Sequence, residues 1–150
     1  MSRRVLLDAN VLIALFEQDH VHHDLAHDWF ADNRSRGWAT CPLTENALIR
    51  VLSNPRYGSN AQRAGALALR LRAFCAGEGH QFWAASLSLG DQTIFDLSFA
   101  THRLLTDVYL LGLAHVNGGT LATFDRTIPV KAVVGAPPDV LEVIAGKNDV

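Results

Sequence analysis

The sequence predicts an α/β fold, a three-layer α/β/α sandwich in which a central, mainly parallel sheet lies between two layers of helices. Short β-prone runs alternate with amphipathic helical segments, and no internal repeat or low-complexity linker interrupts them. The 150 residues, 49% of them hydrophobic, suffice for one continuous core. We therefore expect a single domain over residues 1–150, with a C-terminal tail from about residue 137 to 150 that packs only in part.

The first half of the chain alternates clearly between the two kinds of element. It predicts, in order, a strand over 5–7, a helix through residue 16, a helix over 23–33, a strand over 38–41 and a helix from 45 to a stop at 54–55. Pro42 ends the second strand, and Thr44 is suited to cap the helix that follows.

The second half is less regular. It predicts, in order, a helix over 67–75, an ambiguous stretch over 80–89 that could begin with a short strand, a helix over 107–116, a strand over 120–124 and a final strand over 130–134. Asn117-Gly118-Gly119 ends the last of these helices. Pro137-Pro138 opens the tail, in which Leu141, Val143 and Ile144 could pack back onto the domain.

Four acidic residues stand where an apolar run meets a helix start or a turn: Asp8, Glu45, Asp107 and Asp125. Burying one unpaired carboxylate costs roughly several kcal/mol, and four together would repel one another. Sites in parallel sheets form beyond the carboxyl ends of the strands, so the four acids could converge at one edge. A divalent cation would stabilise such a cluster, and hard oxygen ligands favour Mg²⁺ or Mn²⁺ over Zn²⁺.

The strings around these acids resemble the PIN domain, and within it the VapC-type ribonuclease toxins of toxin-antitoxin pairs. LLDANVLIAL resembles the opening strand and helix with Asp8, and TENALIRVLSNP resembles the helix with Glu45. LLTDVYLLGLAHVNGGTLATFD is the most specific part, because it resembles the segment that carries Asp107, a Gly turn and the strand leading to Asp125. The resemblance covers almost the whole chain and implies a PIN-like sandwich. Taken singly, Glu45 and Asp107 would be better explained as surface carboxylates at helix N-termini, where the helix dipole favours acids.

The resemblance implies a metal-dependent endoribonuclease that hydrolyses phosphodiester bonds in single-stranded regions of RNA. Such hydrolysis needs an activated water and relief of charge on the phosphoryl oxygens, both of which a bound metal supplies. We predict Asp8 and Asp107 as the principal ligands of Mg²⁺ (or Mn²⁺). Glu45 and Asp125 would hold metal-bound waters, help to deprotonate the attacking water or complete a second metal position.

Three further residues have expected supporting roles. Asn10 and Thr123 stand two residues from a site acid and could orient carboxylates or waters. Arg126 follows Asp125 and could approach a phosphate. The segment 90–102 matches the family loosely, and we interpret its acids as ordinary surface groups.

The resemblance also implies partners: a cognate VapB-type antitoxin that neutralises the toxin, a homodimer and a higher toxin-antitoxin complex. A net charge of −2 argues against RNA binding through overall positive charge. Eleven of the thirteen basic residues are Arg, which is compatible with a local phosphate-binding face. No apolar stretch of about eighteen residues indicates a membrane span. Cys41 and Cys75 form no CxxC motif and are interpreted as reduced thiols, so we expect a cytoplasmic protein.

A histidine cluster invites a zinc site, since His23 and His27 are four apart and His20 and His22 precede them. Because no third ligand or H-E-x-x-H pattern accompanies them, we interpret the cluster as a solvated helix start.

Two other functions stay open. A haloacid-dehalogenase-like phosphatase would use Asp8 as its nucleophile, but that class has a second acid two residues on, where this chain has Asn10. A non-catalytic RNA-binding protein would inhibit translation by occupancy alone. Growth arrest undiminished by Asp107→Ala would favour the second alternative.

Overall fold

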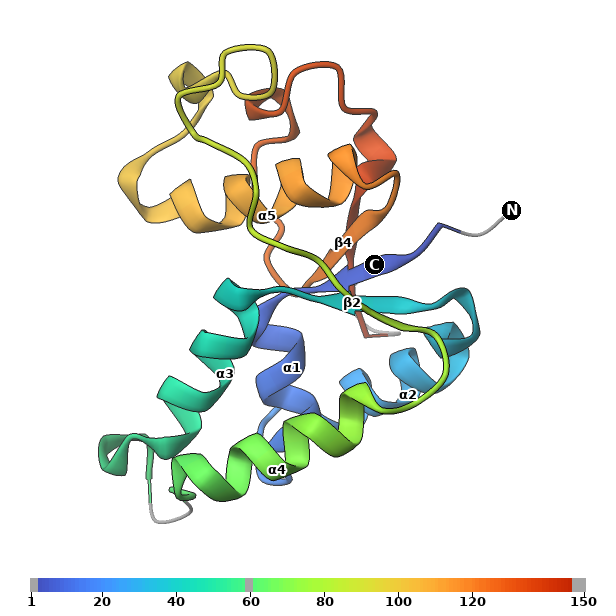
Figure 1. Cartoon of the computed structure of the whole chain (residues 1–150), viewed down its shortest axis with the longest axis vertical. Helices are drawn as coiled ribbons and strands as arrows, with labels where there is room; N and C mark the ends of the chain where they lie inside the picture. Colours follow the sequence, from blue (N-terminus) through green and yellow to red (C-terminus); the bar gives the residue numbers. More distant parts are fainter. Residues whose placement is uncertain (1–2, 59–60, 147–150) are drawn as a thin grey trace.

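The computed structural model describes residues 3–58 and 61–146, and in it a central sheet separates two helical layers (Figure 1). The sheet is built from five strands: β1 (Val5–Leu7), β2 (Trp38–Thr40), β3 (His80–Phe82), β4 (Thr120–Thr123) and β5 (Leu141–Val143). Their spatial order is β3-β2-β1-β4-β5, and every neighbouring pair is parallel. The carboxyl ends of all these strands therefore meet at one edge of the sheet.

Helices cover both faces of the sheet. One face carries α1 (Ala9–Phe16), α2 (His23–Asn33), α3 (Pro42–Ser53) and α4 (Ala64–Cys75), and the other carries α5 (Leu105–Val116) together with the irregular segments 83–104 and 124–140 (Figure 1). Within the described residues, no helix is both long and apolar enough to span a membrane. This α/β architecture is the one that the alternating sequence pattern predicts.

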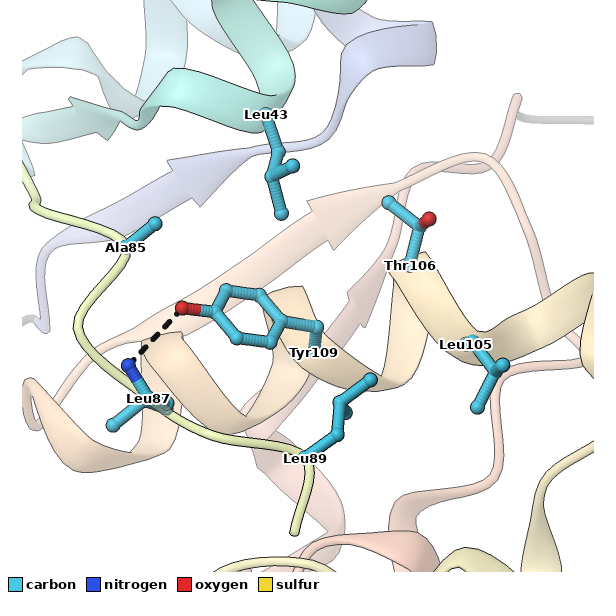
Figure 2. A pocket seen from close by; sticks show the side chains of 7 residues that line it. All are labelled: Leu43, Ala85, Leu87, Leu89, Leu105, Thr106 and Tyr109. Atoms are coloured by element: carbon cyan, nitrogen blue, oxygen red, sulfur yellow. Dashed lines mark hydrogen bonds between the residues drawn. The ribbon is translucent and has the colours of Figure 1, made fainter.

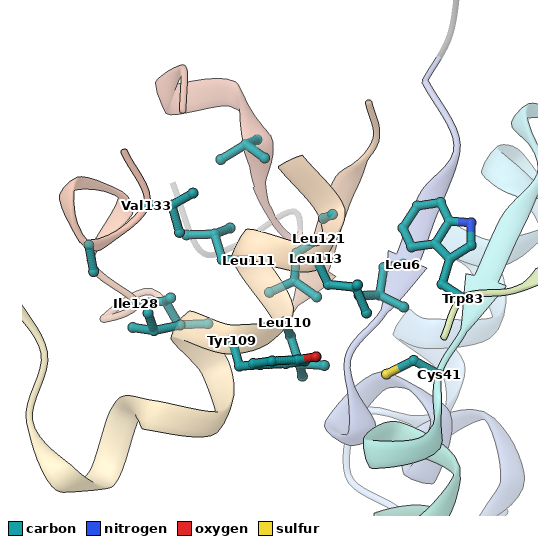
Figure 3. Close-up of a cluster of buried hydrophobic side chains, with 14 of the residues drawn as sticks. Leu6, Cys41, Trp83, Tyr109, Leu110, Leu111, Leu113, Leu121, Ile128 and Val133 are labelled. Atoms are coloured by element: carbon teal, nitrogen blue, oxygen red, sulfur yellow. The ribbon is translucent and has the colours of Figure 1, made fainter. Parts of the chain in front are cut away.

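Successive side chains along the strands point to opposite faces of the sheet, so the core consists of two clusters. Leu6 and Leu121 point into the cluster beneath α5 (Figure 3), whereas Val5 and Leu7 point into the cluster beneath α1–α4. All four side chains are at most 1% exposed, as expected of strands buried on both faces.

The prediction of a strand over 130–134 is wrong. Val130–Ala132 is a 3₁₀ turn, and Val133 makes one isolated antiparallel bridge with Phe95. The place beside β4 is taken by β5, which comes from the expected tail and pairs in parallel with Leu121–Thr123. Residues 147–150 of that tail lie outside the described residues.

The ambiguous stretch after Gly79 resolves into β3 followed by an irregular segment. His80–Phe82 pairs in parallel with β2, which confirms the short strand suggested there. Residues 83–104 form no regular helix or strand; they contain 3₁₀ turns at Leu97–Phe99 and His102–Leu104 and the isolated bridge of Phe95. Both cysteines are free thiols, as predicted.

Candidate active site

Asp8 follows β1 directly and is also the N-cap of α1. Its Oδ1 accepts a hydrogen bond from the Ala9 N–H at 2.7 Å, and its Oδ2 accepts one from the Thr123 hydroxyl at 2.7 Å. The side chain is only 4% exposed, and burial raises the pKa of this carboxyl even though both hydrogen bonds oppose the shift. The carboxylate is therefore held in one place, where its charge is costly without a cation.

The hydroxyl of Thr123 joins three parts of the site. It donates to Asp8 and accepts from the Asn10 side-chain amide at 3.1 Å and from the Asp125 N–H at 3.1 Å. The Asn10 Oδ1 in turn accepts from the Phe124 N–H at 3.4 Å. Thr123 thus contacts the Asp8 carboxylate directly, and Asn10 contacts Thr123, so the orienting roles of both residues stay predictions.

Asp107 and Asp125 reach the same edge from the α5 side. Asp107 lies in the first turn of α5, which leads back into β4 and so begins beside the strand ends. Asp125 follows β4, and its Oδ1 accepts from the Thr127 N–H at 2.8 Å and from the Thr127 hydroxyl at 2.6 Å. Burial, then the charges of Asp8 and Asp125, raise the pKa of Asp107 to about 6. The three carboxylates therefore form one repelling cluster.

The three acids have the donor chemistry of a site for a hard divalent cation, and their oxygens do not all lie within 4.8 Å of one another. Ion pairs join Arg3 to Asp139 and Arg36 to Glu142, and in the described part of the chain no basic side chain forms an ion pair with Asp8, Asp107 or Asp125. The donors are carboxylate oxygens, which Mg²⁺ and Mn²⁺ prefer. A cation would lower the repulsion that the protein itself leaves uncompensated.

Glu45 lies at the same edge, but its carboxylate is engaged elsewhere. It stands in the first turn of α3 on the helical stripe of Leu48 and Leu52, which pack into the α1–α4 side of the core. Its Oε2 accepts from the Thr40 hydroxyl at 2.6 Å, and that hydroxyl lies 2.8 Å from His80 Nε2. The charges that act on Asp107 are those of Asp8 and Asp125, and Glu45 is not among them.

The group around Glu45 also includes Cys75. Burial raises the pKa of the Cys75 thiol, the Thr40 hydrogen bond opposes this rise, and the Glu45 charge adds to it. Burial lowers the pKa of His80, and Glu45 opposes that shift. The structure thus brings Asp8, Asp107 and Asp125 together and places Glu45 with Thr40, Cys75 and His80.

The other polar residues singled out in the sequence have local roles or none. Arg126 is exposed and makes no hydrogen bond or ion pair within residues 3–58 and 61–146. Asp91 and Asp96 accept hydrogen bonds from residues two positions on, which forms tight turns. His23 and His27 contact backbone carbonyls of α1 through one ring nitrogen each.

An open apolar pocket lies beside the first turn of α5 (Figure 2). Its lining residues come from the start of α3, from the segment after β3 and from α5: Leu43, Ala85, Leu87, Leu89, Leu105, Thr106 and Tyr109. The Tyr109 hydroxyl accepts from the Leu87 N–H at 3.1 Å, which fixes the ring in the pocket. None of these lining residues is acidic, and Thr106 precedes Asp107 in the first turn of α5.

Comparison with known proteins identifies the family of this chain. The profile of the PIN domain matches residues 5–133. The chain belongs to the PIN-domain family. This PIN domain is 42% identical over 134 residues to Ribonuclease VapC44 of Mycobacterium tuberculosis, which covers 89% of this chain and 94% of the relative. It is 40% identical over 136 residues to Ribonuclease VapC39 of the same organism, covering 87% of this chain and 94% of the relative. The predicted family is thereby confirmed.

A solved structure shows the same fold. The crystal structure of VapC20 from Mycobacterium tuberculosis, described as a sarcin-ricin loop cleaving toxin, superposes on this PIN domain with a TM-score of 0.62. The comparison covers 89% of this chain and 99% of VapC20 at 13% sequence identity. At that identity the likeness concerns the fold, and it confirms the predicted PIN-like sandwich.

Sequence reasoning missed two features of the site. Thr127 caps the Asp125 turn, and the local D-x-T pattern is a signal that could have indicated it. Cys75 and His80 lie 30 and 35 positions after Glu45, so no local pattern indicates their proximity to it.

Proposed function

We propose that this PIN domain is a VapC-like endoribonuclease toxin that uses Mg²⁺ or Mn²⁺ to hydrolyse phosphodiester bonds in single-stranded regions of RNA. The acid cluster at the strand edge carries the proposal: the charges of Asp8 and Asp125 help to raise the pKa of Asp107 to about 6. Strongly perturbed carboxyl groups that gather beside a pocket are typical of active sites. The relatives named as ribonucleases support the same activity.

The chain's own residues divide the work of binding and proton transfer. When bound, Mg²⁺ would relieve charge on the phosphoryl oxygens and make a nucleophilic water available near neutral pH. Asp8, fixed by Thr123 and Ala9, and Asp107 would hold the ion. Asp125 engages Thr127 through Oδ1 alone, which leaves Oδ2 to orient the attacking water and accept its proton.

Glu45 would join this set after a side-chain rotation. Its position in the first turn of α3 lies at the carboxyl end of β2, beside β1 and Asp8. To act there, its carboxylate must release the Thr40 hydroxyl. Its expected role in holding water therefore stays a proposal that depends on this movement.

The surroundings of the acids suit single-stranded RNA. The apolar pocket that includes Leu87, Leu89 and Tyr109 offers a surface on which an unpaired base could pack. Arg126 is exposed directly after Asp125 and would contact a phosphate. The net charge of −2 means that such local contacts, rather than bulk attraction, would bind the RNA.

The same proposal includes the partners and the cellular location. A cognate VapB-type antitoxin would neutralise the toxin, and the toxin would form a homodimer within a higher toxin-antitoxin complex in the cytoplasm. An apolar groove between α1, α2 and α4, which includes Leu15, Phe30 and Phe74, is a surface on which an antitoxin helix could lie. Co-purification from an operon clone and light scattering of the isolated chain would test these partners.

Cleavage assays with matched variants test the activity. The purified protein should cut an RNA with single-stranded loops in Mg²⁺ or Mn²⁺, and EDTA should abolish the cleavage. Asp8→Asn and Asp107→Asn should each lower the rate at least about 100-fold, because they remove a charged ligand. Asp28→Asn makes the same chemical change at an exposed position of α2 and should leave the rate unaltered. An Asp8→Asn protein that cuts at the original rate would refute the proposal.

A further inference from the structure

A second set of metal donors lies on the α3–α4 side of the sheet edge. A carboxylate oxygen of Glu45, the Cys75 sulfur and a ring nitrogen of His80 all lie within 4.8 Å of one another, and each residue is partly buried. They come from the first turn of α3, the last residue of α4 and the first residue of β3. Regular elements therefore hold the three donors, which gives the group a fixed geometry.

Thr40 links the donors but cannot satisfy all of them. Its hydroxyl lies 2.6 Å from Glu45 Oε2 and 2.8 Å from His80 Nε2, and it also faces the Cys75 thiol. A hydroxyl has one hydrogen to donate, so it serves one acceptor at a time. Among the described residues no basic side chain forms an ion pair with Glu45. A cation could bind the carboxylate, the sulfur and the imidazole together.

We propose that Glu45, Cys75 and His80 form a binding site for a borderline-soft divalent cation of the Zn²⁺ class. A mixed thiolate, imidazole and carboxylate set is the donor chemistry of Zn²⁺ rather than of Mg²⁺. Tetrahedral zinc with bonds of about 2.0 to 2.3 Å has ligand atoms about 3.5 Å apart, so shifts of about 1 Å would close the site. Binding transfers the thiol proton of Cys75 to the buffer and leaves a fourth position for water.

Zn²⁺ at this site would regulate RNA cleavage, a step that rests on the proposed function. Glu45 as a zinc ligand stays on the α3–α4 side and cannot rotate toward Asp8 and Asp107. Zn²⁺ and Mg²⁺ would therefore each require a different orientation of the Glu45 side chain. The expected outcome is inhibition of Mg²⁺-dependent cleavage by Zn²⁺.

Cobalt spectroscopy tests the site without any use of activity. The reduced full chain, in excess Mg²⁺, is titrated with Co²⁺ as a spectroscopic substitute for Zn²⁺. We expect one equivalent to give tetrahedral visible bands and a near-ultraviolet thiolate-to-cobalt band, both removed by Zn²⁺. Cys75→Ser should lose the thiolate band, and His80→Gln and Glu45→Gln should weaken Co²⁺ binding at least about tenfold.

Two control variants locate the signal. Asp8→Asn alters the acid cluster and should keep the thiolate band. His23→Gln alters the N-terminal histidines and should keep it too. A thiolate band that persists in Cys75→Ser would overturn the zinc site. The absence of this band from the unaltered chain, when circular dichroism shows that the chain is folded, would overturn it as well.

Inhibition is then measured in the RNA-cleavage assay with Mg²⁺. Cys75→Ser should need at least about tenfold more Zn²⁺ for half-inhibition than the unaltered chain, because it lacks one ligand. Equal sensitivity of the two proteins would overturn the regulatory link. Absence of cleavage in Mg²⁺ alone would count against the nuclease, whereas the Co²⁺ spectrum judges the zinc site by itself.

Discussion

Replacing Asp107 by Asn should stabilise the metal-free protein at neutral pH. Asn has nearly the same shape as Asp but no charge. Burial and the charges of Asp8 and Asp125 destabilise the charged form of Asp107, so the substitution removes this destabilisation. The pKa of Asp107 rises on folding from 3.8 to about 6, so between these values the folded state binds more protons than the unfolded state. Stability therefore falls as the pH rises through this window, and the penalty is fully present above it.

The size of the effect follows from the pKa shift. A rise of about 2 pKa units at about 1.4 kcal/mol per unit gives about 3 kcal/mol, and solvent screening of this partly exposed group reduces it to about 2 kcal/mol. In a chain of this length, 1 kcal/mol changes the Tm by about 2 to 4 °C. Asp107→Asn should thus melt about 4 to 8 °C higher at about pH 7.5. At about pH 4.5 the difference should fall by more than half.

Thermal unfolding in EDTA across this pH range measures the difference, with Asp28→Asn as an exposed control. Added Mg²⁺ should reverse the order at neutral pH, because the ion stabilises the unaltered chain and binds the variant weakly. A variant less stable than the unaltered chain in EDTA at neutral pH would refute the reasoning. A gap that does not change with pH would refute it as well, since the charge of Asp107 would then play no part.

The remaining predictions concern positioning and packing. Thr123→Val should lower Mg²⁺ affinity and cleavage about 10- to 100-fold, because Val cannot donate to Asp8, and Thr123→Ser should restore most of both in Mg²⁺ titrations. Gly112→Ala should cost about 1 to 3 kcal/mol in urea unfolding, because its Cβ would lie 2.4 Å from the Phe95 ring. Gly65→Ala has nothing within 4 Å and should stabilise by up to about 1 kcal/mol, so equal effects of the two alanines would contradict this packing argument.

The sequence predicts those parts of the site that lie next to strand ends. Asp8 and Asp125 follow apolar runs that form the adjacent strands β1 and β4. Because both strands are parallel, their ends meet, and the short return from α5 to β4 places Asp107 beside them. The charges of both acids raise the pKa of Asp107, which agrees with three acids at one edge of the sheet. Local pattern and parallel topology together were sufficient for this much.

The edge of the sheet beyond β4 could not be predicted in the same way. The runs 130–134 and 141–143 are both short and β-prone, so local propensity does not decide between them. Contacts distant in sequence decide it: Glu142 of β5 pairs with Arg36 at 2.6 Å and accepts a hydrogen bond from Thr120 of β4. Burial raises the pKa of the Glu142 carboxyl, and the hydrogen bonds from Arg36 and Thr120 lower it. The lowering effects are larger, so the pKa of Glu142 is below its usual value.

Glu45 shows why a motif can fix the place of a residue without fixing the direction of its side chain. The motif sets Glu45 in the first turn after β2, and helical periodicity then aligns it with Leu48 and Leu52 on the buried stripe. Cys75 at the end of α4 and His80 at the start of β3 lie beside Glu45, although they follow it by thirty positions or more in the chain. A carboxylate in this position has two alternative sets of partners, the hard acid cluster and the softer donors beside Thr40. One hydrogen bond from Thr40 is weaker than either divalent cation would be, so in our proposals the ions present decide which way Glu45 points.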